Sequence, residues 1–470
     1  MDFRLLQDTI CAIATPIGEG GIGLIKISGP DALNVATQLF RHRSGADKTL
    51  ESHRLNYGWI INPDTREIVD EVLLAYMAAP GTYTREDVVE INCHSGYAVL
   101  DRILRLVVAC GARPAEPGEF TRRAFLNGRI DLSQAEAVID IIRSRSEQAL
   151  LLANRHLRGD FRSVIESWRE TILQVQSRIE AFIDFAEDIP EEAEQEEHAF
   201  RFLLDELRRD VMLPLTEALL RYGEGRMLRE GLTLVLVGKP NVGKSSTLNA
   251  LLGKDRAIVT AAPGTTRDVI EDSFLLSGVQ VRVLDTAGIR NQPDEIESCG
   301  IERTLRSVGE ADVVLWLIDH SRPLTSEDHK VYDAVRGSRY VVLLNKSDLP
   351  PAFGLEKVHE KFAGPAPLLR ISAKAPSDIE RLKTFLAETF VRKPLERCRS
   401  EIVPNLRQKR CLEEAAAALS RAEELLDSGA YGELAGFELQ TSRKQLEAIL
   451  GWENDGDLLD RIFSQFCVGK

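Results

Sequence analysis

Gly-Lys-Pro-Asn-Val-Gly-Lys-Ser, residues 238–245, matches the pattern G-x-x-x-x-G-K-[ST] at every position. An apolar run at 232–237 precedes this stretch, and residues 246–252 have the pattern of the first turns of a helix. A buried strand, a glycine-rich loop and a helix in this order predict a phosphate-binding loop, because the loop N–H groups and the helix N-terminus favour anions. Lys244 is then expected to reach the β- and γ-phosphates, and the Ser245 hydroxyl to bind Mg²⁺.

Three further motifs follow apolar runs and decide which nucleotide is bound. Asp285-Thr-Ala-Gly offers a carboxylate for Mg²⁺ through water and a glycine N–H for the γ-phosphate. Asn345-Lys-Ser-Asp resembles the N-K-x-D guanine signature of GTPases, and Ser372-Ala-Lys resembles their supporting S-A-K element. Asp348 would accept from the guanine N1–H and 2-amino group, and adenine would leave it unpaired. The four motifs predict a GTP-binding α/β domain over residues 230–390.

Composition sets the broad class. A chain of 470 residues with 44% hydrophobic and 28% charged residues is expected to be globular and to hold two to four domains. Its seven cysteines include no C-x-x-C pair, which argues against structural zinc and a disulfide framework. With no signal peptide and no membrane-length apolar run, we expect a cytoplasmic protein without a membrane partner. The net charge of −14 argues against a broad basic surface for nucleic acid but leaves a local one open.

The periodicity of apolar residues changes along the chain. Residues 1–120 alternate short strand-like runs with helices, and Glu90 alternates with apolar neighbours, a pattern more typical of a sheet edge than of a site. From about residue 117 the period becomes helical, with Ser133 and Glu136 as a capping box. Helical patterns return after residue 406, which suggests one helical domain interrupted by an insertion. The expected domains are residues 1–120, 121–229, 230–390 and 391–470.

Five stretches carry a resemblance to a known family. They read Ala-Thr-Pro-Ile-Gly-Glu-Gly-Gly-Ile-Gly at 14–23, Pro-Gly-Glu-Phe-Thr-Arg-Arg-Ala-Phe-Leu-Asn-Gly at 117–128, Asp-Leu-Ser-Gln-Ala-Glu-Ala at 131–137, Ala-Pro-Gly-Thr-Thr-Arg-Asp at 262–268, and Phe-Cys-Val-Gly-Lys at 466–470. The whole chain resembles the MnmE (TrmE) family of tRNA-modification GTPases. The resemblance implies an N-terminal α/β folate-binding domain, followed by a helical domain into which a Ras-like P-loop GTPase domain is inserted.

The resemblance also implies a site for 5-formyl- or methylene-tetrahydrofolate, the one-carbon donor. Its contacts fall on Lys26, Glu90, Arg129 and Lys470. Lys26 stands where an arginine is common and Arg129 where a lysine is common, so charge is kept while hydrogen-bond geometry changes. Without the resemblance, Lys26 would be interpreted as an edge-strand lysine. Cys467 is interpreted either as a catalytic, one-carbon-handling thiol or as a small apolar residue that docks the tail.

Hydrolysis needs groups beyond the four motifs, because Ile289 stands where many small GTPases have a water-orienting glutamine. The resemblance implies that Asn241 coordinates K⁺ at the position of an arginine finger, and that Glu297 positions water. Asn241 as a mere shaper of the loop, and Glu297 as a surface residue, are the alternatives.

A switch loop completes the metal sites in the family. The resemblance implies that Thr260, Ala262 and Thr265 complete the K⁺ site, and that Thr266 binds Mg²⁺ and the γ-phosphate. The catalytic residues are then Glu297, Asn241, Lys244 and Cys467. The full set predicted to bind GTP is Asn241, Val242, Gly243, Lys244, Ser245, Ser246, Thr260, Ala261, Ala262, Pro263, Gly264, Thr265, Thr266, Asp285, Thr286, Ala287, Gly288, Asn345, Lys346, Asp348, Ser372, Ala373 and Lys374.

The expected function follows from the resemblance. A K⁺-stimulated GTPase, activated by G-domain dimerisation, would act with the flavoprotein MnmG in a heterotetramer. Together they would add a carboxymethylaminomethyl-type group to carbon 5 of the wobble uridine of certain tRNAs. The competing hypothesis is a switch protein such as a ribosome-assembly GTPase, and a third is a nucleotide-gated scaffold with a vestigial folate site.

Overall fold

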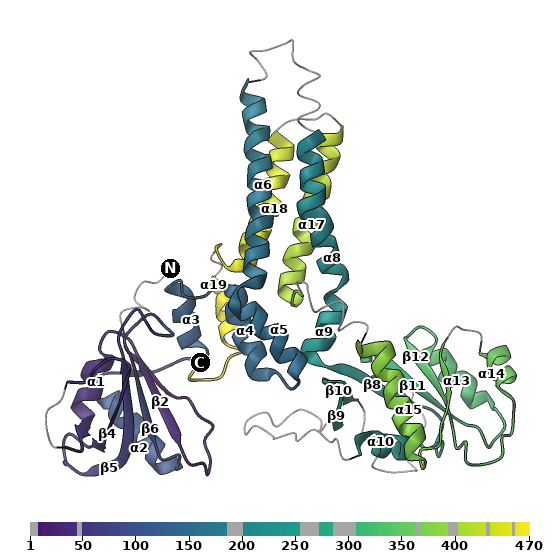
Figure 1. Ribbon diagram of the computed structural model, residues 1–470, viewed down its shortest axis with the longest axis horizontal. Coiled ribbons are helices and arrows are strands. Elements are labelled where there is room, and N and C mark those ends of the chain that lie inside the picture. Colours follow the sequence, from purple (N-terminus) through teal and green to yellow (C-terminus); the bar gives the residue numbers. More distant parts are fainter. Residues whose placement is uncertain are drawn as a thin grey trace. The chain divides into compact units, whose positions relative to one another are not determined.

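The computed structural model describes residues 8–44, 49–185, 201–253, 272–284, 307–362, 366–392, 403–428, 433–453 and 456–470. The chain divides into two bodies (Figure 1). One comprises residues 1–139, 155–207 and 417–470, and the other comprises residues 140–154 and 208–416.

The first body contains a seven-stranded mixed sheet, in the order β3-β4-β5-β6-β2-β1-β7. Two helices, α1 (Ala32–Leu39) and α2 (Tyr97–Ala109), supply core residues that pack with one face of it. Alternating side chains explain this arrangement, since successive residues of a strand point to opposite faces. The strands are β1 (Ile10–Ile13), β2 (Gly23–Ser28), β3 (Phe40–His42), β4 (Arg54–Ile61), β5 (Ile68–Met77), β6 (Val88–Cys93) and β7 (Arg113–Pro114).

The open face of this sheet carries the polar residues that alternate with the core. Val89 and Ile91 are fully buried, and Glu90 between them faces the other way, as the alternation predicts. In the register of the sheet, Glu90 pairs with Lys26 across β6 and β2. Both strands lie inside the sheet, so the expectation that these residues are edge residues is wrong. A charged pair in mid-sheet needs a reason other than tolerance at an edge.

Helices complete the first body. In Figure 1, α6 and α18 run side by side, and α19 lies near α3. The helices are α3 (Glu119–Leu126), α4 (Leu132–Arg143), α5 (Glu147–Arg158), α6 (Asp160–Phe185), α18 (Glu433–Leu450) and α19 (Gly456–Phe463); α4 and α5 continue into the second body.

The N-cap of α4 differs from the one that the sequence predicts. Asp131 caps the helix, because its Oδ1 accepts from the Ser133 hydroxyl and the Gln134 N–H, while Gln134 Oε1 accepts from the Asp131 N–H. The capping box is therefore Asp131 with Gln134, two residues earlier than predicted. Ser133 donates its hydroxyl to the capping Asp131 and does not cap the helix itself.

The C-terminal tail docks on the first body. Phe466 is buried beside Phe463, and the Gly118 N–H points to the Cys467 carbonyl at 3.5 Å. Gly469 has a φ of +94°, and a Cβ there would lie 2.8 Å from the Ile13 carbonyl oxygen. Only glycine fits this left-handed, close-packed position, so the tail is held against the strand that ends at Ile13.

The second body is built on a six-stranded sheet, in the order β13-β12-β11-β8-β10-β9. All neighbouring strands are parallel except β9 and β10. The central runs are apolar throughout, as buried parallel strands require. The strands are β8 (Leu232–Val237), β9 (Asp272–Leu276), β10 (Val279–Val283), β11 (Val313–Asp319), β12 (Tyr340–Asn345) and β13 (Leu368–Arg370).

Helices cover both faces of this sheet, and two separate apolar clusters fill the two interfaces. The α-helices described in this body are α8 (Leu213–Leu220), α9 (Tyr222–Glu230), α10 (Lys244–Leu252), α13 (Ser326–Val335), α14 (Leu355–Lys361), α15 (Pro376–Leu386) and the first half of α17 (Leu406–Asp427), whose second half belongs to the first body. The predicted fold class, α/β domains combined with an all-α part, is confirmed. The exact domain limits stay a prediction.

Across the described residues, none of the helices combines the length and the apolar character that a membrane span requires.

Candidate functional site: a nucleotide site and a cationic site

The phosphate loop follows β8 and opens α10. Gly238 and Gly243 have φ values of +148° and +100°, so the loop uses the freedom of both glycines. The Lys244 ammonium donates to the carbonyls of Gly238 and Lys239, at 2.7 and 2.8 Å. Burial lowers the pKa of Lys244. The two carbonyls hold the ammonium at the phosphate loop, where phosphate oxygens would compete with them for its N–H groups.

The remaining loop residues divide between exposed and buried. Asn241 is exposed and has a φ of +62°, a conformation that asparagine tolerates better than most residues. Val242 is buried, and its carbonyl points to the guanine motif. Ser245 and Ser246 lie in the first turn of α10 and are exposed. The helix thus presents a hydroxyl where the pattern predicts a magnesium ligand.

Asn345 holds the two halves of the nucleotide site together. Its Nδ2 donates to the Val242 carbonyl at 2.7 Å, and its Oδ1 accepts from the Ala373 N–H at 3.1 Å. A Cβ at Gly243 would lie 2.2 Å from that Nδ2, so the loop needs glycine there. Asn345 was predicted to bind GTP. Its described bonds give it a positioning role, because they fix the phosphate loop to the S-A-K element, and its contact with GTP stays a prediction.

The carboxylate of Asp348, in the guanine motif, is exposed, and a hydrogen bond fixes its orientation. Asp348 Oδ1 accepts from the Ser372 hydroxyl at 2.7 Å, and this hydrogen bond is the main cause that lowers the pKa of Asp348. Ser372 Oγ also accepts from the Lys374 N–H at 3.3 Å. Lys346 pairs with Asp319 at 2.7 Å and so anchors the same turn to β11. The ionised carboxylate that guanine recognition requires is therefore held ready.

Several predicted residues lie outside the described ranges. They comprise the switch loop, the second phosphate motif and the water-positioning glutamate, namely Thr260, Ala261, Ala262, Pro263, Gly264, Thr265, Thr266, Asp285, Thr286, Ala287, Gly288 and Glu297. Their roles stay predictions.

A second site lies on the open face of the N-terminal sheet. Lys26 Nζ lies 3.8 Å from Glu90 Oε1, and the Lys26 side chain is only 15% exposed. That separation is too long for a hydrogen bond. Burial lowers the pKa of Lys26, Glu90 opposes this shift, and Lys470 adds to it. Lys470 therefore lies close enough to Lys26 for the two positive charges to repel each other.

Aromatic rings connect the cations of this site. The Lys26 ammonium lies 5.8 Å from the centre of the Tyr83 ring and 5.5 Å from that of Phe120, and the Arg129 guanidinium lies 4.8 Å from Tyr83. The Tyr83 hydroxyl bonds to that of Thr121 at 3.0 Å. Tyr83 thus stands between two cations that are 103 positions apart in the sequence. We define Lys26, Glu90, Arg129 and Lys470 with Tyr83 and Phe120 as the cationic site.

Sequence analysis missed both rings. Phe120 lies in a family stretch, but an apolar residue at the start of a helix gives no sign of a site. Tyr83 lies outside every stretch singled out above, between β5 and β6. Its only sequence signal is an aromatic residue in a loop between two strands, which is a weak one.

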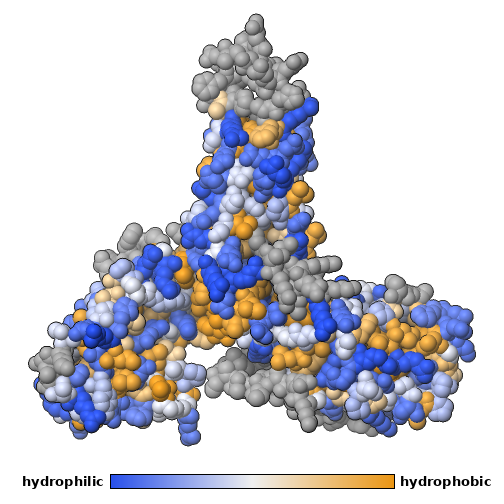
Figure 2. Space-filling view, in the orientation of Figure 1, coloured by the Kyte–Doolittle hydropathy of each residue, from blue (hydrophilic) through white to orange (hydrophobic). Residues whose placement is uncertain are grey.

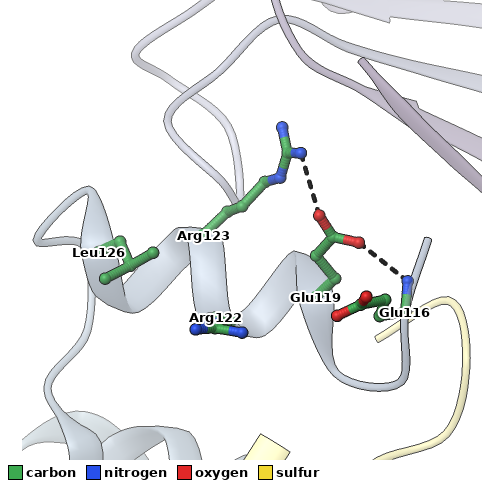
Figure 3. A pocket seen from close by; sticks show the side chains of 5 residues that line it. All are labelled: Glu116, Glu119, Arg122, Arg123 and Leu126. Atoms are coloured by element: carbon green, nitrogen blue, oxygen red, sulfur yellow. Dashed lines mark hydrogen bonds and ion pairs between the residues drawn. The ribbon is translucent and has the colours of Figure 1, made fainter. Parts of the chain in front are cut away.

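An ion cluster fixes α3 beneath the cationic site. Arg123 is 2% exposed and contacts Asp8, Glu86 and Glu119. Figure 3 shows the Glu119 carboxylate accepting hydrogen bonds from Arg123 through one oxygen and from the Glu116 N–H through the other, while Arg122 points away. Burial favours a higher pKa for Glu119, but the arginines and the N–H lower the pKa overall. The helix that carries Phe120 is therefore anchored by charge.

The last residues of the chain divide the two roles considered for Cys467. Phe466 and Gly469 dock the tail, whereas Cys467 is exposed. The interpretation of Cys467 as the docking residue therefore loses its support. The thiol role stays a prediction.

The fold and the nucleotide site define a P-loop GTPase domain carried by a larger α/β and helical protein. Two protein-family models match this sequence. The family model "MnmE helical domain" matches residues 132–467, and the family model "GTP-binding protein TrmE N-terminus" matches residues 9–129. A tRNA modification GTPase MnmE of Syntrophobacter fumaroxidans is 60% identical over all of both chains. Those of Geobacillus kaustophilus and Carboxydothermus hydrogenoformans are each 43% identical, over 98% and 99% of this chain and 99% and 100% of theirs.

The chain belongs to the MnmE family of tRNA modification GTPases. It is a GTP hydrolase, and the predicted binding of GTP is confirmed.

Proposed function

We propose that this chain uses GTP hydrolysis to drive modification of carbon 5 of the wobble uridine of certain tRNAs, together with an MnmG-type flavoprotein. The added group is of the carboxymethylaminomethyl type, and a tetrahydrofolate provides the carbon. The observation that carries the proposal is the cationic site. Its four charged residues come from four separate segments: Lys26 and Arg129 contact the Tyr83 ring, Glu90 lies 3.8 Å from Lys26, and the charge of Lys470 lowers the pKa of Lys26.

The chemistry of the cationic site fits a folate. The Lys26 side chain is 15% exposed and meets Glu90 only at 3.8 Å, without a hydrogen bond in its described surroundings, so the ammonium can take a further anionic partner. The glutamate tail of folate is anionic, and the N–H groups of its pterin edge suit the Glu90 carboxylate. Tyr83 and Phe120 offer apolar ring surface beside the cations. When bound, 5-formyl- or methylene-tetrahydrofolate supplies the one-carbon unit.

The nucleotide site supports a metal-assisted hydrolysis. Ser245 and Thr266 would hold Mg²⁺, and Asn241 with Thr260, Ala262 and Thr265 would hold K⁺. Of the proposed K⁺ ligands, Asn241 lies in the described part of the chain, and its exposed amide suits a hard cation.

Charge and water would then be handled by separate groups. A cation beside Lys244 would neutralise charge that develops on the phosphates, and Glu297 would orient the attacking water. Closure of two G domains on GTP and their release after hydrolysis would form the switch.

An apolar area on the open face of the N-terminal sheet supports a homodimer. Leu55, Tyr57 and Leu73 lie on adjacent strands and are 67, 36 and 43% exposed. The register of the sheet puts them on the same face as Glu90 and Lys26. Figure 2 shows apolar side chains on the surface of this domain. A second copy that covers this area would bury it and border the cationic site.

The flavin and its reductant are assigned to the partner. Residues 18–23 match the dinucleotide pattern G-x-G-x-x-G in letters, but they join the antiparallel strands β1 and β2. A dinucleotide site needs the pattern between a parallel strand and the helix that follows it. The redox part of the reaction therefore calls for a flavoprotein, in a heterotetramer with the dimer.

Calorimetry with 5-formyltetrahydrofolate tests the proposal. We expect one folate per chain for the wild type and at least a roughly ten-fold weaker affinity for Glu90→Gln, because an ionic hydrogen bond is lost. Glu67→Gln, which changes an exposed carboxylate near the same sheet, should bind like the wild type. A folded, GTP-hydrolysing wild type that binds no folate would contradict the proposal and favour a switch protein of the ribosome-assembly kind.

A further inference from the structure

A pocket of about 280 Å³ lies beside the loop that carries Arg129, between the α3–α4 loop, α6 and the end of α18. Among the described residues that line it, none belongs to a predicted site. This volume is just below the range of sites for drug-sized ligands, so it suits one ring system. The apolar part of its wall is made by Phe125, Leu126, Ile130, Leu450 and Trp452.

A buried carboxylate with one unused oxygen forms the polar part of this pocket. The Asp131 side chain is 3% exposed, and its Oδ1 is committed to the N-cap of α4. Its Oδ2 is buried and has no hydrogen-bond partner among the described residues; Arg162 Nε lies 3.9 Å away. Such an acceptor is costly unless a donor reaches it. Burial also raises the pKa of Asp131.

Two side chains define the mouth of the pocket. Arg162 is 41% exposed, and its Nε donates to Glu166 at 2.7 Å. No bond of its terminal nitrogens occurs in the described part of the chain, so they are available to an anion or a carbonyl. Trp452 is 43% exposed, and the Arg169 guanidinium lies 5.2 Å from its ring centre. Arg169 is itself held by Glu447 at 2.7 Å, which fixes the indole.

These features select among planar ligands. A single free carboxylate oxygen matches a ring with one N–H, and a guanidinium beside it matches a neighbouring carbonyl or a phosphate. Uracil offers one imide N–H between two carbonyl oxygens. Guanine and pterin present two adjacent N–H donors, which need both carboxylate oxygens. Cytosine presents an acceptor at N3, which an ionised Asp131 repels.

We propose that this pocket holds the uracil ring of the tRNA nucleotide that is modified, turned out of its loop. The ring lies against Trp452 and Phe125, its N3–H donates to Asp131 Oδ2, and Arg162 receives the adjoining phosphate. Unstacked bases on aromatic side chains are the usual way in which proteins read single-stranded RNA. This inference rests on the proposed function, because it assumes a uridine substrate.

The position of the pocket supports this assignment. Gly128 and Ile130 line the pocket, while Arg129 between them reaches Tyr83 of the cationic site. Both sites therefore use the three-residue segment 128–130 of the α3–α4 loop, within the same body of the protein. A one-carbon donor in one site and a uracil in the other would be neighbours.

Binding of labelled anticodon stem–loops to the full-length protein tests the pocket, with uridine or cytidine at the wobble position and at one fixed salt concentration. The wild type should prefer uridine by roughly ten-fold, the discrimination that one good hydrogen bond gives. Asp131→Asn keeps the N-cap through Oδ1 and puts an amide N–H donor at the position of Oδ2; this donor opposes uracil N3–H and suits cytosine N3, so the preference for uridine should vanish or reverse. Trp452→Leu should lower the affinity for both stem–loops by about ten-fold, because the ring that stacks on the base is lost.

Matched controls separate a local effect from misfolding. Arg162→Gln should weaken binding, whereas Arg178→Gln, an exposed arginine on the same helix that pairs with Glu206, should not. GTP hydrolysis and folate affinity should stay unchanged in Asp131→Asn. In addition, a hairpin with 4-thiouridine at the wobble position should crosslink to peptides that contain Phe125 or Trp452.

Two results would overturn the inference: a wild type without preference for uridine, or an Asp131→Asn variant that keeps the preference. Crosslinks confined to other peptides would do the same. If the uridine preference is present and folate binding is absent, the pocket assignment stands and the folate part of the proposed function fails.

Discussion

The nucleotide site and the cationic site are built in opposite ways. The nucleotide site uses short contiguous motifs, each at the end of a parallel strand, so that backbone N–H groups do much of the work. The cationic site takes β2, β6, a loop before α4 and the C-terminal residue, which lie far apart in the sequence. Local motifs can be recognised in a sequence alone, whereas a site assembled by tertiary packing becomes visible only when the fold brings its members together.

The largest expected effect separates the two sites. Lys244→Ala should lower GTP turnover by roughly 10²–10³-fold, because the loop loses the charge that stabilises the developing phosphate charge. Folate affinity should stay unchanged, since Lys244 belongs to the other body. Steady-state GTP hydrolysis and calorimetry measure both quantities. Lys357→Ala, an exposed lysine on α14, is the matched control. A parallel loss of folate binding would show that the sites are not separable.

A change of nucleotide specificity tests whether the Asp348 carboxylate recognises the guanine base. Asp348→Asn should weaken GTP binding by about 10–100-fold, because a hydrogen bond to a charged group is lost. It should strengthen binding of xanthosine triphosphate, whose 2-oxo group can accept from the asparagine amide. Competition with a fluorescent GTP analogue measures both affinities. Asp333→Asn, an exposed position on α13, should leave them unaltered. An equal loss of affinity for both nucleotides would argue against recognition of the base by Asp348.

A substitution in the C-terminal tail tests whether docking of the tail places Lys470 in the cationic site. Gly469→Ala introduces a Cβ 2.8 Å from the Ile13 carbonyl at a left-handed φ, so the tail should detach and remove Lys470 from the site. We expect roughly ten-fold weaker folate binding, as for the loss of one ionic contact. GTP hydrolysis should be unchanged, and Val468→Ala, which alters an exposed neighbour, should have no effect. Unaltered folate affinity would exclude the tail from the site.

The smallest effect is a pH dependence. Burial lowers the pKa of Lys26, so its positive charge is lost at a lower pH than that of an ordinary lysine. Folate affinity should therefore fall as the pH rises through this lowered pKa. Lys26→Arg keeps its charge throughout and should flatten the profile, with a change of a few-fold at neutral pH. Calorimetry over an alkaline pH series measures it. An identical slope in both proteins would exclude titration of Lys26 as the cause.

The sequence predicts the nucleotide site well for a physical reason. Leu232–Val237 is apolar throughout, and the loop after it needs glycine at 238 and 243, so strand, loop and helix follow from local patterns. The role of Asn345 is less accessible, because its bonds to Val242 and Ala373 cross between strands.

The first body shows the limits more clearly. Alternation around Glu90 predicts the face of its side chain, but not that β6 lies inside the sheet. The N-cap of α4 was placed at Ser133, because the capping pattern cannot distinguish Ser133 from Asp131 two residues before it. Tyr83 has no local signal, since its contacts with Lys26 and Arg129 exist only in the fold.

Transfer of a labelled one-carbon unit from folate to tRNA tests the central claim most directly. The reaction would contain the flavoprotein partner, GTP and tRNA, with wild type, Glu90→Gln or Lys244→Ala protein. We predict label in the wobble uridine with the wild type, strong loss with Glu90→Gln despite normal GTP hydrolysis, and strong loss with Lys244→Ala despite normal folate binding. Undiminished label with Glu90→Gln would contradict the assignment of one-carbon chemistry to this chain.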